Sequence, residues 1–162
     1  MQIKFPFETI DNIRDKLITS RQTMAIAESV TSGLLQAAMS QASDARMFFQ
    51  GGFTLYNVPQ KCRQLGIEPI HALDQNGVSP RVAGEMASGV ARSFCSQFGI
   101  GVVGYAAPVP EKHVERPFAY YAICEEGRLL DTARIEGHIA HPLDNQLHYV
   151  TEILHALLRL LS

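Results

Sequence analysis

Hydrophobic residues at helical spacing occur near both ends of the chain. The apolar positions are Phe7, Ile10, Ile13 and Leu17 near the amino end, and Leu143, Leu147, Val150, Leu154, Leu157 and Leu161 near the carboxyl end. Recurrence every three or four residues is typical of a helix with one buried face. The pattern therefore predicts an amphipathic helix over about residues 7–19 and a long final helix beginning near Pro142.

Between these two helices, short apolar runs alternate with turn residues and further helical patterns. The runs that predict strands are 23–27, 53–57, 100–106, 118–124 and 129–135. Helices are expected after the turn at 29–33, from Pro59 to a stop at Gly66, and from Ser79-Pro80 to about Phe98 with Gly99 as the stop. The region 107–117 holds three prolines and is expected to be a loop.

The alternation of helices and strands indicates an α/β layered domain. Its first part should be parallel, and the last two strands should form an antiparallel hairpin around residues 125–128. Ligands of such sheets bind beyond the carboxyl ends of the strands. The turn that begins at Ser29 falls at such an end, so it is the first place to look for chemistry.

Composition narrows the class of protein. A chain of 162 residues, 46% hydrophobic, can bury one sizeable core, so a single domain over residues 1–162 is expected. The 14 basic and 16 acidic residues are scattered, which argues against nucleic acid as a partner. Three cysteines without close pairing predict neither a disulfide framework nor a zinc site. Charges interrupt every early apolar stretch, so we expect a cytoplasmic protein without a membrane partner.

Four blocks of sequence, in order, carry a family resemblance. AESVTSG at 27–33 resembles the motif AES-C-T-G-G of the CinA carboxy-terminal domain, a family that includes bacterial nicotinamide-nucleotide amidases. GGFTLYNVPQK at 51–61, NGVSPRVAGEMASGVA at 76–91 and VGYAAPVPEKHVERP at 103–117 are similar to its later blocks. Four ordered blocks are more specific than any one of them, so the chain is identified as a divergent member of that family.

The resemblance implies a single three-layer α/β/α domain, with a mixed, mostly parallel sheet flanked by helices. It also implies a homo-oligomer that hydrolyses nicotinamide mononucleotide to nicotinate mononucleotide and ammonia, with no metal and no organic cofactor. The family's hydroxyl, tyrosine and lysine positions match Ser29, Thr31, Tyr56 and Lys61. If this chain is active, Ser29 would be recruited as the nucleophile, Lys61 would be the base if it is held neutral, and Tyr56 would help to polarise the amide.

Substrate binding is expected around the same blocks. The candidate residues are Glu28, Thr31, Gly33, Arg46, Gly104 and Ala107. Glycine-rich turns let backbone amides approach an oxyanion, and a helix amino terminus after Ser32-Gly33 could meet a phosphate. Glu28 could orient a base or the ribose, or it could serve the amino end of the adjoining helix, and the sequence leaves both readings open.

The chain departs from the family pattern at several of these positions. Arg46 stands where the family has the serine that we expect to be its usual nucleophile, Val103 replaces a hydroxyl residue and Ala107 replaces a glycine. No arginine occurs between Gly137 and Arg159, where the family carries several. These losses favour a protein that kept the fold and lost or weakened the reaction, and now binds a nucleotide or a partner. The alternative is an active amidohydrolase that uses Ser29 and Lys61.

Each candidate also has a structural explanation. Ser29 and Thr31 could cap the following helix, Lys61 could be solvated, and Tyr56 could simply pack in the core. Arg46 could be an ordinary surface residue or could bind a phosphate. His141, Asp144 and His148 share one helical face, but their spacing is not that of a named metal motif, so an exposed or hydrogen-bonded set is favoured over a metal site.

Overall fold

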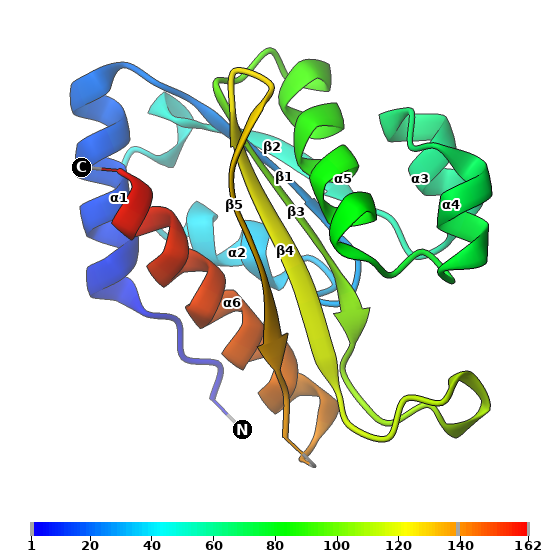
Figure 1. Ribbon diagram of the computed structural model, residues 1–162. Helices are drawn as coiled ribbons and strands as arrows, with labels where there is room; N and C mark the ends of the chain where they lie inside the picture. The colour runs from blue at the N-terminus through cyan, green and yellow to red at the C-terminus, as the bar shows by residue number, and fades with distance from the viewer. Residues whose placement is uncertain (1, 139, 162) are drawn as a thin grey trace.

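The computed structural model describes residues 2–138 and 140–161, which form one five-stranded mixed sheet between two layers of helices (Figure 1). The strands are β1 (Met24–Glu28), β2 (Phe49–Thr54), β3 (Phe98–Tyr105), β4 (Phe118–Glu125) and β5 (Arg128–Glu136), in the spatial order β2-β1-β3-β4-β5. β1 pairs parallel with β2 and β3, whereas β3–β4 and β4–β5 are antiparallel. The predicted α/β fold with a terminal hairpin is therefore confirmed.

The helices divide between the two faces of the sheet. They are α1 (Phe7–Ser20), α2 (Leu34–Ser40), α3 (Val58–Leu65), α4 (Pro69–Asp74), α5 (Pro80–Ser93) and α6 (Pro142–Leu160), with single 3-10 turns η1 (Ala45–Met47) and η2 (Pro110–Lys112). Figure 1 shows α1, α2 and α6 on one face and α3, α4 and α5 on the other. No helix of the described residues is long and apolar enough to cross a membrane.

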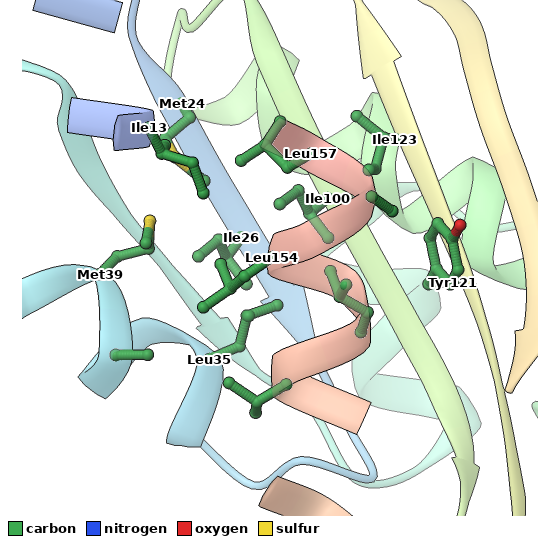
Figure 2. Close-up of a cluster of buried hydrophobic side chains, with 14 of the residues drawn as sticks. Ile13, Met24, Ile26, Leu35, Met39, Ile100, Tyr121, Ile123, Leu154 and Leu157 are labelled. Carbon is green, nitrogen blue, oxygen red and sulfur yellow. The ribbon is translucent and has the colours of Figure 1, made fainter. Parts of the chain in front are cut away.

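The two faces are packed by different kinds of side chain. Under α1, α2 and α6 most of the core side chains are large, among them Ile26, Ile100 and Leu154 (Figure 2). On the opposite face α5 lies against the backbone of β3, where a Cβ on Gly101 would sit 2.1 Å from the Ala83 carbonyl oxygen. The close approach of α5 therefore depends on glycine in the strand.

Three sequence predictions need correction. α5 ends at Ser93 rather than near Phe98, because Cys95 adopts a left-handed conformation (φ 51°) and turns the chain into β3. β2 covers 49–54 rather than 53–57, with glycines inside it, since a Cβ on Gly52 would lie 2.0 Å from the Ile26 carbonyl oxygen. The short helix α4 was not predicted; the Glu68 carboxylate caps it by accepting from the amides of Ile70 and His71.

Candidate functional site

A cleft of about 430 Å³ opens beyond the carboxyl ends of β1 and β3, where parallel sheets bind their ligands. It collects residues from the β1–α2 turn, the segment after β2, the loop before α5, the β3–β4 loop and the first turns of α6. Its lining is Ser29, Val30, Tyr56, Lys61, Asn76, Val78, Gly104, Tyr105, Ala106, Ala107, Val109, Glu111, Lys112 and Gln146. The structure thus brings Ser29 together with Tyr56 and Lys61, which follow it by 27 and 32 residues in the sequence.

Ser29 is fixed by its backbone and leaves its hydroxyl unused. Its amide donates to the Val102 carbonyl of β3 at 3.1 Å, and the Gln146 side chain donates to the Val30 carbonyl at 2.8 Å. Among the described residues no hydrogen bond engages the Ser29 hydroxyl, and the residue is 8% exposed. A hydroxyl on an anchored turn at the cleft wall is well placed to meet a ligand.

The Glu28 side chain holds the turn that follows β1 through buried hydrogen bonds. Its buried carboxylate accepts from the Thr31 hydroxyl at 2.6 Å and from the amides of Leu35 and Gln36 at 3.0 and 2.8 Å. Of the two readings that the sequence left open, the structure selects the one in which Glu28 serves the amino end of the helix.

Those contacts correct three expectations about substrate binding. Glu28 and Thr31 are buried and bonded to each other, and neither lines the cleft. Gly33 adopts φ +92° as the turn enters α2, and it also lies outside the lining. Because Glu28 already occupies the first amides of α2, the amino terminus of this short helix is not free for a phosphate.

Lys61 is a buried lysine in the wall of the cleft. α3 begins where Asn57 accepts from the Gln60 amide at 3.0 Å, and the next position, Lys61, is 2% exposed. Burial, with a smaller effect from the Lys112 ammonium, lowers the pKa of Lys61 to about 8. No carboxylate of the described residues forms a salt bridge with Lys61, so a part of this group is neutral near neutral pH and can accept a proton.

The remaining walls carry aromatic and charged groups. Tyr56 is 66% exposed, so core packing does not account for it. Across the cleft the Lys112 ammonium lies 5.9 Å from the centre of the Tyr105 ring, next to Glu111 in η2. The cleft can therefore accept a flat, partly polar molecule that carries negative charge.

Arg46 lies at the other end of the sheet. It is exposed in η1, directly before β2, whose first residue pairs with Met24 at the amino end of β1, whereas Ser29 follows the carboxyl end. The interpretation that Arg46 replaces a group of this cleft is therefore wrong within this chain. Val103 is fully buried in the core under α5, so of Arg46, Val103 and Ala107 only Ala107 lines the cleft, beside Gly104.

The histidine cluster has structural partners. The His141 ring accepts from the Leu143 amide at 3.3 Å at the start of α6, and the His148 ring lies 3.2 Å from the Glu136 carbonyl. The part of the chain that the structure describes contains no group of His, Cys, Asp and Glu arranged to hold a metal ion. The hydrogen-bonded reading of these histidines is thus the one that the geometry supports.

Several cleft residues had not been singled out from the sequence. They are Asn76, Tyr105, Glu111, Lys112 and Gln146. Tyr105 is the last residue of β3, and Glu111 and Lys112 lie in the loop that follows it, so a place at or after the carboxyl end of a strand was the available signal. Gln146 belongs to α6, which reaches the site from 116 residues away in sequence, and no local pattern indicates that contact.

Comparisons with known proteins agree with this fold. The sequence profile of the "CinA C-terminal domain" matches residues 7–161. A putative competence-damage inducible protein of Moorella thermoacetica is 34% identical over 62% of this chain, and a CinA-like protein of Picosynechococcus is 38% identical over 59%. The aligned regions are 25% and 23% of those proteins, so this chain matches only about a quarter of their length.

Solved structures extend the likeness to almost the whole chain. The competence or damage-inducible protein of Enterobacter asburiae superposes with a TM-score of 0.91 at 23% identity, over 98% of this chain and 99% of that one. The CinA superfamily protein of Enterobacter cloacae also gives 0.91 at 23% identity, over 100% and 95%. At these identities the structures establish the fold, while the profile match covers 7–161. The chain therefore belongs to the CinA C-terminal domain family.

Proposed function

We propose that this protein is an amidohydrolase in which Ser29 is the nucleophile and Lys61 the general base. One observation carries the proposal: a hydroxyl that has no hydrogen-bond partner among the described residues and a buried lysine with a lowered pKa line the same cleft. A serine–lysine pair needs a lysine that is partly neutral, and burial supplies that condition.

The reaction would proceed through an acyl-enzyme. The Ser29 oxygen bonds to the carboxamide carbon as Lys61 takes the hydroxyl proton, and the carbonyl electrons move onto oxygen. The carbon–nitrogen bond then breaks, and the protonated Lys61 gives its proton to the leaving nitrogen, which departs as ammonia. A water molecule, deprotonated by Lys61, cleaves the ester and releases the carboxylate and free Ser29. Tyr56 would donate a hydrogen bond to the polarised amide.

The substrate class follows from the cleft lining and from the family. Tyr56 and Tyr105 offer aromatic surface to a flat ring, and Lys112 offers a positive charge to a phosphate. Nicotinamide mononucleotide joins a pyridine carboxamide to a phosphate, so it is the first substrate to test. The lining requires neither a metal nor an organic cofactor for this chemistry.

A second candidate function is nucleotide binding without turnover. It is favoured by Ala107, whose methyl group stands in the cleft wall where the family has glycine. Backbone that is shielded by a side chain approaches an oxyanion less closely. Under this alternative the same ligand would bind, and the carboxamide would survive.

Ammonia release from nicotinamide mononucleotide separates the two candidates. We expect turnover by the unmodified protein, and a loss of at least about 10³-fold in Ser29→Ala and in Lys61→Met. Lys16→Met, which changes an exposed lysine of α1, is the matched control and should keep full activity. A ligand-induced rise in melting temperature without ammonia would favour binding alone, because bound ligand stabilises the folded state by mass action.

A further inference from the structure

Two buried polar side chains of α6 hold the loop that follows β3. The Asn145 amide donates to the Ala106 carbonyl at 2.9 Å, and the Tyr149 hydroxyl donates to the Tyr105 carbonyl at 2.9 Å. Asn145 is 1% exposed and Tyr149 is fully buried. Two successive carbonyls of the cleft wall are thus turned toward α6 by groups that the hydrolysis described above does not use.

The orientation of those carbonyls fixes the direction of the neighbouring amides. A trans peptide is planar, with its N–H antiparallel to its C=O. The N–H groups of Ala106 and Ala107 therefore point away from α6, and both residues line the cleft. Within the described residues neither of these N–H groups donates a hydrogen bond, so a pair of unused donors lies side by side in the cleft wall.

Close packing around the loop after β3 keeps its peptide groups from rotating. Asn145 also donates to the His138 carbonyl at 2.9 Å and accepts from the His138 amide at 2.8 Å, so its amide group has a fixed orientation. A Cβ on Gly137 would lie 2.5 Å from the Tyr149 hydroxyl and 3.0 Å from the Asn145 Oδ1. The positions of both anchoring side chains thus depend on backbone that only glycine permits.

We propose that Asn145 and Tyr149 are positioning residues that aim the Ala106 and Ala107 amides into the cleft as an oxyanion hole. The inference rests on the proposed hydrolysis at Ser29, whose tetrahedral intermediate would place a negative oxygen on those amides. Two donors aimed before reaction stabilise such an oxygen without reorganisation.

Two substitutions test the anchoring in the complete protein. Tyr149→Phe removes one hydroxyl and keeps the ring, so it should fold, and we expect kcat for ammonia release to fall about 10-fold with KM changed less than about 2-fold. Asn145→Ala should lower kcat about 10²-fold with the same constancy of KM. Unchanged kcat in both variants, with an active unmodified protein, would overturn the inference and leave the proposed hydrolysis standing.

Tyr121→Phe is the matched control. Tyr121 is also a buried tyrosine, but its hydroxyl donates to Asp131 at 2.6 Å and not to the cleft wall. A general effect of losing a buried tyrosine hydroxyl would lower kcat equally in Tyr121→Phe and Tyr149→Phe, and this outcome would also contradict the inference. We expect unchanged kcat in Tyr121→Phe.

A readout that does not depend on turnover is the amide NMR signals of Ala106 and Ala107. The aldehyde analogue of nicotinamide mononucleotide can add the Ser29 oxygen to its carbonyl carbon, with the hydroxyl proton passing to Lys61, to give a tetrahedral oxyanion. We expect both amide signals to move together in the unmodified protein and to stay in place in Asn145→Ala. If ammonia is not released, the hydrolysis proposal fails, and this titration still decides the inference: a joint movement supports it and unmoved signals overturn it.

Discussion

Two hollows of similar size differ in what their polar groups do. A groove of about 480 Å³ lies between α5 and β5, and the cleft at the carboxyl ends of β1 and β3 measures about 430 Å³. In the groove Arg81 donates to Glu85 at 2.8 Å, and the remaining charged residue, Arg92, is a guanidinium that cannot act as a base. In the cleft the Ser29 hydroxyl and the Lys61 ammonium have no such partner among the described residues. Unpaired reactive groups, rather than volume, distinguish a candidate active site.

Lys61→Met is expected to have the largest effect, and it acts in opposite directions on activity and stability. Activity should fall at least about 10³-fold because the base is lost. Lowering the pKa of Lys61 from 10.5 to about 8 means that burial of the charged ammonium costs about 3 kcal/mol at neutral pH. Lys61→Met removes this cost, so the variant should unfold at a higher denaturant concentration. Urea unfolding at pH 7, followed by circular dichroism, measures the gain.

The pH dependence of that stability gain has a definite sign. The unfolded protein keeps Lys61 protonated up to about pH 10.5, whereas the folded protein releases the proton near pH 8. Stability of the unmodified protein therefore rises with pH between these values, and the advantage of Lys61→Met shrinks there. An advantage that stays constant from pH 7 to pH 10 would contradict a lowered pKa.

Glu28→Gln should destabilise the turn beneath the cleft. An amide cannot accept with both of its polar atoms, so either the Gln36 amide or the pair formed by Thr31 and the Leu35 amide loses its acceptor. Leaving such buried donors unsatisfied costs about 1–3 kcal/mol in the free energy of unfolding. Glu152→Gln, an exposed change on α6, is the control, and equal stability of the two variants would count against the capping role of Glu28.

Gly84→Ala is expected to have the smallest effect on stability, and it tests whether the groove between α5 and β5 takes part in the function. An added Cβ meets nothing within 4 Å, and Ala is favoured over Gly inside a helix by about 0.5–1 kcal/mol. We expect slightly higher stability and unchanged ammonia release. Gly89→Ala on the same helix should be destabilising, since its Cβ would lie 2.6 Å from the Leu65 carbonyl oxygen. Reduced ammonia release in Gly84→Ala would mean that the groove takes part in the function.

The position of Arg46 could have been predicted from the sequence. Matching motif letters assigned this residue to the active site, yet a helix between two parallel strands returns the chain to the amino end of the sheet. The order of β1, α2 and β2, which had been predicted, was therefore enough to put Arg46 at the end opposite Ser29. For Arg46 the topology is the better guide, because it gives the end of the sheet at which the residue lies, whereas motif matching gives only its counterpart in the family pattern.

Other features could not be predicted from local patterns. The pKa of Lys61 depends on burial by elements that are distant in sequence, and the contacts of Asn145 and Tyr149 join α6 to a loop about 40 residues earlier. By contrast, the strand–turn–helix units and the final hairpin follow from short-range spacing and were predicted, although β2 was placed at 53–57 rather than 49–54 and α4 was missed. The secondary structure around the site follows from local sequence, whereas the properties of its side chains depend on tertiary contacts.

The pH dependence of kcat/KM for ammonia release from nicotinamide mononucleotide tests the central claim most directly. If Lys61 is the base, kcat/KM of the unmodified protein rises with pH and levels off above an apparent pKa of about 8, because only the neutral amine accepts the Ser29 proton. The substitution Lys112→Met removes a positive charge that lowers the pKa of Lys61, so it should move the rise in kcat/KM to higher pH. Turnover that is independent of pH from 6 to 10, or that persists in Ser29→Ala, would contradict the account.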